Sequence, residues 1–169
     1  MNAAPFILTL RFDPDSFERF DTARRRHFPA DRNLIPAHLT LFHHLPGDRH
    51  AEIAATLASL AARQSAFPLT IPSLRFLGQG TAYAIESPDL MALRQELAIR
   101  WARNLTRQDA QGFRPHVTIQ NKVPAARARA LHAELLASFV PFAATATGLL
   151  LWRYLGGPWD AAGAYAFSG

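Results

Sequence analysis

Two short segments of this 169-residue sequence place a histidine two positions before a threonine, in each case shortly after a proline. The first segment holds His38 and Thr40, the second holds His116 and Thr118, and the residues between and after them are apolar. In a β-strand, residues i and i+2 point to the same face, about 7 Å apart along the chain. Each segment therefore predicts a strand that presents one imidazole and one hydroxyl on one face and packs its apolar residues on the other.

Two imidazoles and two hydroxyls suit the hydrolysis of a phosphodiester. A base must activate water and an acid must protonate the leaving oxygen, and in-line geometry puts them on opposite sides of phosphorus. Imidazoles, with an unperturbed pKa of about 6.5, can hold opposite protonation states at neutral pH. The hydroxyls can donate to the non-bridging oxygens. These residue types leave open which histidine is the base, and the alternative is two histidines at the edge of the core that bond to neighbouring threonines.

The elements that must position these residues occur in the same order twice. Each half of the sequence has the order strand, helix, strand with the His-x-Thr segment, helix, strand, which indicates an internal duplication within one α+β domain. We expect a single domain over 1–169, with lobes at about 1–80 and about 81–169 and with strands exchanged between them. The predicted strands cover 6–12, 38–42, 67–77, 81–86, 116–123 and 142–155, with a short final strand near 164–167. The predicted helices begin at 13, 49, 87 and 124, and a polar loop covers 106–115.

The composition excludes several kinds of site. The chain has no cysteine, which rules out disulfides, thiol nucleophiles and zinc sites built on cysteine. Its net charge of +5 suits an anionic ligand such as RNA or a nucleotide, although the basic residues are scattered. Adjacent residues on a strand point to opposite faces, so His43 and His44 cannot easily chelate together, and we expect no metal. No targeting or membrane-spanning segment is visible, which predicts a cytoplasmic protein without a membrane partner.

The segments 36–42, 114–122 and 151–159 resemble the 2H phosphoesterase superfamily, in particular the 2′-5′ RNA ligase-like branch that includes the RNA 2′,3′-cyclic phosphodiesterases. This resemblance implies a pseudo-twofold α+β fold of duplicated β-α-β-α-β lobes, in which two antiparallel sheets line a central groove and the helices lie outside. It implies that His38 and His116 are catalytic, that Thr40 and Thr118 hold phosphate, and that no cofactor or metal is needed. The sequence departs from the family where Gln-Asn-Lys follows the second segment in place of an arginine.

The first functional hypothesis is a metal-independent phosphodiesterase that opens a 2′,3′-cyclic phosphate on RNA ends or nucleotides. It requires no obligate protein partner. A second hypothesis is a nucleotide- or RNA-binding module that keeps the groove without turnover. A third is a 2H enzyme that acts on 2′-5′ linkages or on ADP-ribose cyclic phosphate, and the sequence does not separate it from the first.

Strand alternation adds four candidate substrate contacts around the two segments. Phe42 and His44 continue the face of His38 if their strand is regular, and Gln120 and Lys122 continue the face of His116. Lys122, the single lysine of the chain, could add a cation near the phosphate.

Four further candidates come from other predicted strands. Trp152 and Tyr154 share one strand face and could stack on a base, although aromatic core residues are commoner. Arg75 and Tyr83 flank the central turn and could reach the groove.

Overall fold

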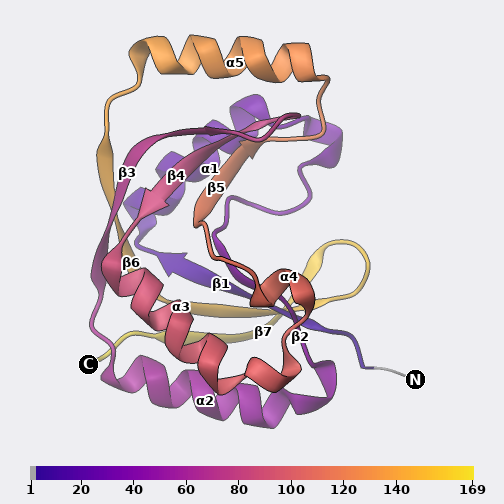
Figure 1. The fold of residues 1–169 in the computed structure, drawn as a ribbon, viewed down its shortest axis with the longest axis vertical. Helices are drawn as coiled ribbons and strands as arrows, with labels where there is room; N and C mark the ends of the chain where they lie inside the picture. The colour runs from indigo at the N-terminus through magenta and orange to yellow at the C-terminus, as the bar shows by residue number, and fades with distance from the viewer. Residues whose placement is uncertain (1–2) are drawn as a thin grey trace.

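Strands and helices are interspersed along the chain in the computed structural model, which describes residues 3–169 (Figure 1). The strands of this part are β1 (Phe6–Phe12), β2 (Thr40–Leu45), β3 (Phe67–Phe76), β4 (Thr81–Glu86), β5 (His116–Gln120), β6 (Phe142–Tyr154) and β7 (Trp159–Ala166). The α-helices are α1 (Pro14–His27), α2 (His50–Arg63), α3 (Pro88–Arg100), α4 (Arg107–Ala110) and α5 (Ala125–Ser138). The predicted α+β class is confirmed.

All strand pairs are antiparallel, and the strand order is β2-β1-β6-β3-β4-β5 with β7 also paired to β6. The long strand β6 joins the two halves of the sheet. Its first residues pair with β3, and its later residues lie between β1 and β7. The two expected sheets are therefore continuous through β6, and the strands that carry the histidine segments, β2 and β5, are the two ends of the strand order.

The helices pack against the sheet from several sides. Helix α1 contacts β5, α2 contacts β6 and β7, and α5 contacts β3 and β4 (Figure 1). Helices α1 and α3 begin where the sequence predicts, because Asp13 and Ser87 each accept a hydrogen bond from a backbone N–H of the first turn and a proline follows each of them. Within residues 3–169, no helix combines the length and the apolar composition needed to cross a bilayer.

Several boundaries differ from the sequence-based expectations. The second strand covers Thr40–Leu45 rather than 38–42, and β5 ends at Gln120 rather than at 123. The helix expected over 87–105 ends at Arg100, and the short helix α4 forms inside the expected polar loop, where Thr106 caps it. The final strand begins at Trp159 rather than near 164, because the turn after Tyr154 folds β7 back along β6 as a hairpin. Pairing with a neighbour therefore extends a strand whose own sequence is weakly apolar.

The apolar residues of both histidine segments are anchored in the core. Leu39, Leu41, Val117 and Ile119 are all buried. This burial on one face fixes the direction of the histidine and threonine side chains on the other.

Candidate active site

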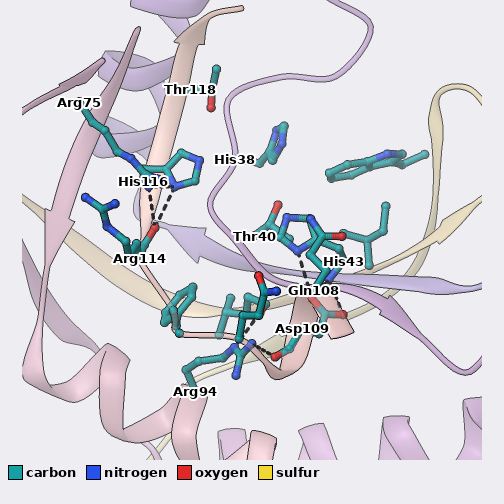
Figure 2. Close-up of a pocket in the computed structure, with 16 residues that line it drawn as sticks. His38, Thr40, His43, Arg75, Arg94, Gln108, Asp109, Arg114, His116 and Thr118 are labelled. Carbon is teal, nitrogen blue, oxygen red and sulfur yellow. Dashed lines mark hydrogen bonds and ion pairs between the residues drawn. The ribbon is translucent and has the colours of Figure 1, made fainter. Parts of the chain in front are cut away.

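The four residues of the two His-x-Thr segments line one cavity of about 380 Å³ between β2 and β5 (Figure 2). His38 lies just before β2 and Thr40 begins that strand, while His116 and Thr118 both lie on β5. The two histidines come from segments at opposite ends of the strand order, and both side chains line a common space. The structure therefore places these four side chains around one space, as the family resemblance implies.

Both imidazoles are held in the same way. The Nδ1 atom of His38 lies 2.8 Å from the carbonyl oxygen of Pro36, and the Nδ1 atom of His116 lies 2.9 Å from that of Arg114. A carbonyl oxygen can only accept, so Nδ1 carries the hydrogen in His38. At His116, Arg75 Nη1 also lies 3.2 Å from Nδ1 and can only donate, but the carbonyl contact is the shorter of the two and favours a protonated Nδ1 there as well. The Nε2 atom of each neutral ring is consequently left free to accept a proton.

Burial disfavours the charged form of both rings. It lowers the pKa of His38 to about 4, and the nearby Arg24 and His116 act in the same direction, against the hydrogen bond to Pro36. Burial is also the main cause of a lowered pKa at His116, and the guanidinium of Arg75, whose Nη1 lies 3.2 Å from Nδ1, lowers it further. His38 is therefore neutral at neutral pH in the free protein.

Two buried arginines fix the strands that carry the histidines. Arg24 of α1 donates from Nη1 to the carbonyl oxygen of Thr118 at 2.9 Å, and Arg94 of α3 donates from Nε to that of Leu41 at 2.7 Å. Each guanidinium also lies over a phenyl ring, at about 4 Å from its centroid. A helix from each half of the chain thus holds the histidine strand of the other half.

Trp159 is a cavity residue that the sequence analysis did not single out. Its ring lies edge-on to His38, with 4.8 Å between the centroids. Trp152, one of the two candidate stacking residues, does not line the cavity, and its Nε1 donates to Thr9 Oγ1 at 2.9 Å. Trp159 follows two glycines and a proline, so its sequence predicts a turn rather than a wall of the site.

The regular alternation assumed after Thr40 is wrong. Strand β2 shifts register twice against β1, and these irregularities change which residues face the cavity. Phe42 is fully buried and packs against Trp101, and His44 is exposed but does not line the cavity. His43 lines it instead.

The two candidates after the second segment have different positions. Gln120 is buried at the end of β5 and does not line the cavity. Lys122 lies with Tyr154 along a second compartment of about 390 Å³, and this compartment shares the walls formed by His38 and Trp159 with the first. A ligand could therefore extend from the space between the histidines toward Lys122.

Arg75 and Tyr83 are separated by the structure. Arg75 lines the cavity beside His116. Tyr83 packs between Phe20 and Phe142, and burial raises its pKa. Of the two candidates that flank the central turn, Arg75 lines the cavity and Tyr83 does not.

Three histidines, a residue type that commonly binds metals, fall between positions 43 and 50. In the part of the chain that the structure describes, no three His, Asp or Glu side chains are close enough together to hold a metal ion.

The comparison with known protein families agrees with the geometry of this site. A sequence model of the 2′-5′ RNA ligase superfamily matches residues 12–158, a span that includes both histidine segments. The chain belongs to the 2′-5′ RNA ligase superfamily. The resemblance to 2H phosphoesterases is thereby confirmed, and membership of this superfamily implies a phosphodiesterase activity. No curated protein matched the sequence.

Solved structures of this superfamily have the same fold. The protein TT0787 of Thermus thermophilus superposes with a TM-score of 0.71 at 16% sequence identity, covering 98% of each chain. E. coli LigT complexed with 3′-AMP superposes with a TM-score of 0.66 at 18% identity, covering 98% of this chain and 99% of LigT. LigT has also been solved with ATP and with NADP+.

Proposed function

We propose that this protein is a metal-independent phosphodiesterase that hydrolyses a 2′,3′-cyclic phosphate on RNA ends or nucleotides. The observation that carries the proposal is the convergence of His38, Thr40, His116 and Thr118 on one cavity, with both Nδ1 atoms fixed by carbonyl oxygens. Two free Nε2 atoms facing a shared space provide the acid and the base that the reaction needs.

His38 is the general base in this proposal. Its pKa of about 4 keeps the ring neutral, so Nε2 can take a proton from the attacking water. As water adds to phosphorus, the bond from phosphorus to one ribose oxygen breaks, and a phosphomonoester remains on the other.

His116 is the general acid. It donates the Nε2 proton of its imidazolium to the departing ribose oxygen, and the phosphate in the cavity favours that charged form. Arg75 lies close to the ring, and its positive charge makes the imidazolium a stronger acid. The hydroxyls of Thr40 and Thr118 donate to the non-bridging oxygens, where they stabilise the redistributed charge.

Hydrolysis of 2′,3′-cyclic nucleotides in the presence of EDTA tests the proposal. His38→Ala and His116→Ala are each expected to lower kcat by about 10² to 10⁴. His50→Ala, which removes an exposed histidine at the start of α2, is the matched control and should retain activity. Losses below tenfold in both cavity variants, with the proteins folded, would contradict the proposal. Nucleotide affinity measured by calorimetry without any turnover would favour a binding module instead.

The second compartment favours one further candidate substrate. Because the two compartments share the wall formed by His38 and Trp159, a phosphodiester could place one nucleoside in each. A 2′-5′-linked dinucleotide has this shape, whereas a cyclic phosphate carries its nucleoside on one side only. A panel of cyclic phosphates and 2′-5′ dinucleotides, compared by kcat/KM, decides between the two substrates.

A further inference from the structure

A third histidine, His43, lines the same cavity as His38 and His116 (Figure 2). Burial is the main cause of the lowered pKa values of His38 and His116, and the charge of His43 contributes to both shifts. His43 therefore shares a cavity with both rings, although neither the proposed base nor the proposed acid requires it.

The anchor of His43 differs from those of the other two rings. Its Nδ1 lies 3.1 Å from Oδ1 of Asp109, a carboxylate that is only 1% exposed. The backbone N–H of His43 donates to both oxygens of this carboxylate, at 2.8 and 3.0 Å, and that of His44 donates to Oδ2 at 2.9 Å. Burial raises the pKa of Asp109, but these hydrogen bonds outweigh it and hold the pKa below its usual value. Asp109 is therefore an ionised, fully engaged acceptor.

The position of Asp109 is itself fixed. Thr106 Oγ1 accepts from its backbone N–H, and Arg94 Nη2 donates to its carbonyl oxygen at 2.6 Å. The same Arg94 donates to the carbonyl oxygen of Leu41 on β2. Helix α4 and strand β2 are thus tied together at the point where His43 enters the cavity.

We propose that His43 is a third substrate-contacting residue, whose Nε2 binds a non-bridging oxygen of the phosphate, with Asp109 as its positioning residue. This inference rests on the proposed phosphodiesterase function. Since Nδ1 is committed to Asp109, Nε2 is the one polar atom of the ring that remains for the cavity. In the substrate complex the ring lies between two anions, and an imidazolium can donate to both.

NMR of the histidine nitrogens in the full chain tests the contact directly. The chain has seven histidines, so individual ¹⁵N signals can be assigned by substitution. On titration with inorganic phosphate, the Nε2 signal of His43 is expected to shift with the same dissociation constant as those of His38 and His116, while its Nδ1 stays protonated. If the His43 signal is unchanged at saturating phosphate while the other two respond, the inference is overturned.

Kinetics of His43→Gln provides the second test, with His44→Gln as the matched control. His44 is the adjacent histidine, and its side chain does not line the cavity. Loss of one charge-assisted hydrogen bond is expected to lower kcat/KM by about 10- to 100-fold, mainly through KM, and to raise the Ki of inorganic phosphate in parallel. The inference is overturned if kcat/KM and the Ki of inorganic phosphate in His43→Gln both stay within about twofold of their values in His44→Gln. A twofold difference is too small for the loss of a hydrogen bond.

Asp109→Asn tests the positioning role. The ¹⁵N signals of His43 are expected to lose the pattern of a protonated Nδ1, and kcat/KM to fall in the same direction as in His43→Gln. An unchanged ¹⁵N pattern of His43 in folded Asp109→Asn would contradict the positioning role of Asp109. If Asp109→Asn does not fold, the kinetics of His43→Gln still test the contact between His43 and the phosphate. Absence of turnover in the wild-type protein would refute the proposed function, whereas the phosphate titration would still show whether His43 binds the anion.

Discussion

Replacement of Arg75 by glutamine should move the basic limb of the pH profile of kcat/KM to higher pH. His116, the proposed acid, must be protonated, so activity falls as the pH rises through its pKa. Burial and then the charge of Arg75 lower that pKa, and removal of the charge therefore raises it. The closest atoms of the two groups are 3.2 Å apart. Two unit charges about 4 Å apart interact by about 1 kcal/mol in water and about 4 kcal/mol at an effective dielectric constant of 20. Arg75 is half-buried, so the lower end applies and the expected shift is about one pH unit.

The assay is hydrolysis of a 2′,3′-cyclic nucleotide under first-order conditions across the pH range, at constant low ionic strength. The acidic limb, set by His38 with its pKa of about 4, should stay in place in Arg75→Gln. Higher salt should reduce the difference between the variant and the wild type, because it screens partly exposed charges. Arg49→Gln, which removes an exposed arginine paired with Glu52, is the control and should leave both limbs unchanged. A basic limb that stays in place or moves to lower pH in Arg75→Gln would refute the assignment of His116 as the acid.

Three further substitutions probe the wall of the site, a close backbone contact and the core. Trp159→Ala should expose His38 and raise its pKa, so the acidic limb of kcat/KM should move to higher pH; an unchanged limb would contradict the role of burial. Gly80→Ala would drive Cβ into the carbonyl oxygen of Gln120 and should cost about 1–3 kcal/mol in urea unfolding, with wild-type stability as the contrary result. Leu57→Ala, in the fully buried face of α2, should lower the free energy of unfolding by about 2–5 kcal/mol, and a loss below about 1 kcal/mol would show that the site collapses around the cavity.

Local patterns predicted most of the fold correctly. The first strand was expected over 6–12 and is found at Phe6–Phe12, because a mostly apolar run between a proline and an Asp-Pro pair has few alternatives. Features that depend on pairing with a neighbouring strand were not predictable from local patterns. The register shifts of β2 arise in its pairing with β1, and the length of β7 comes from its pairing with β6.

The same distinction applies to the candidate site. Strand alternation predicted that each His-x-Thr pair would share one face with the apolar residues behind it, and the family resemblance implied that the two pairs face a common groove. His38 and His116 do line one cavity. Their catalytic roles stay predictions. The contact between His43 and Asp109 joins residues 66 positions apart, and Asp109 lay in a segment expected to be a loop. No spacing rule links two such residues, and the register shifts of β2 mean that simple alternation selects His44 instead of His43.

The sheet ends at β2 and β5 without closing into a barrel, and this has a consequence for solubility. Unpaired strand edges expose backbone groups that invite pairing with other chains, and proteins commonly cover them to avoid aggregation. Here Arg24 and Arg94 each donate to one carbonyl oxygen of an end strand, Thr118 on β5 and Leu41 on β2, so these two oxygens are already engaged. A strand of another chain that approached either end of this strand order would meet a carbonyl oxygen already bound by the arginine that also holds a histidine segment in place.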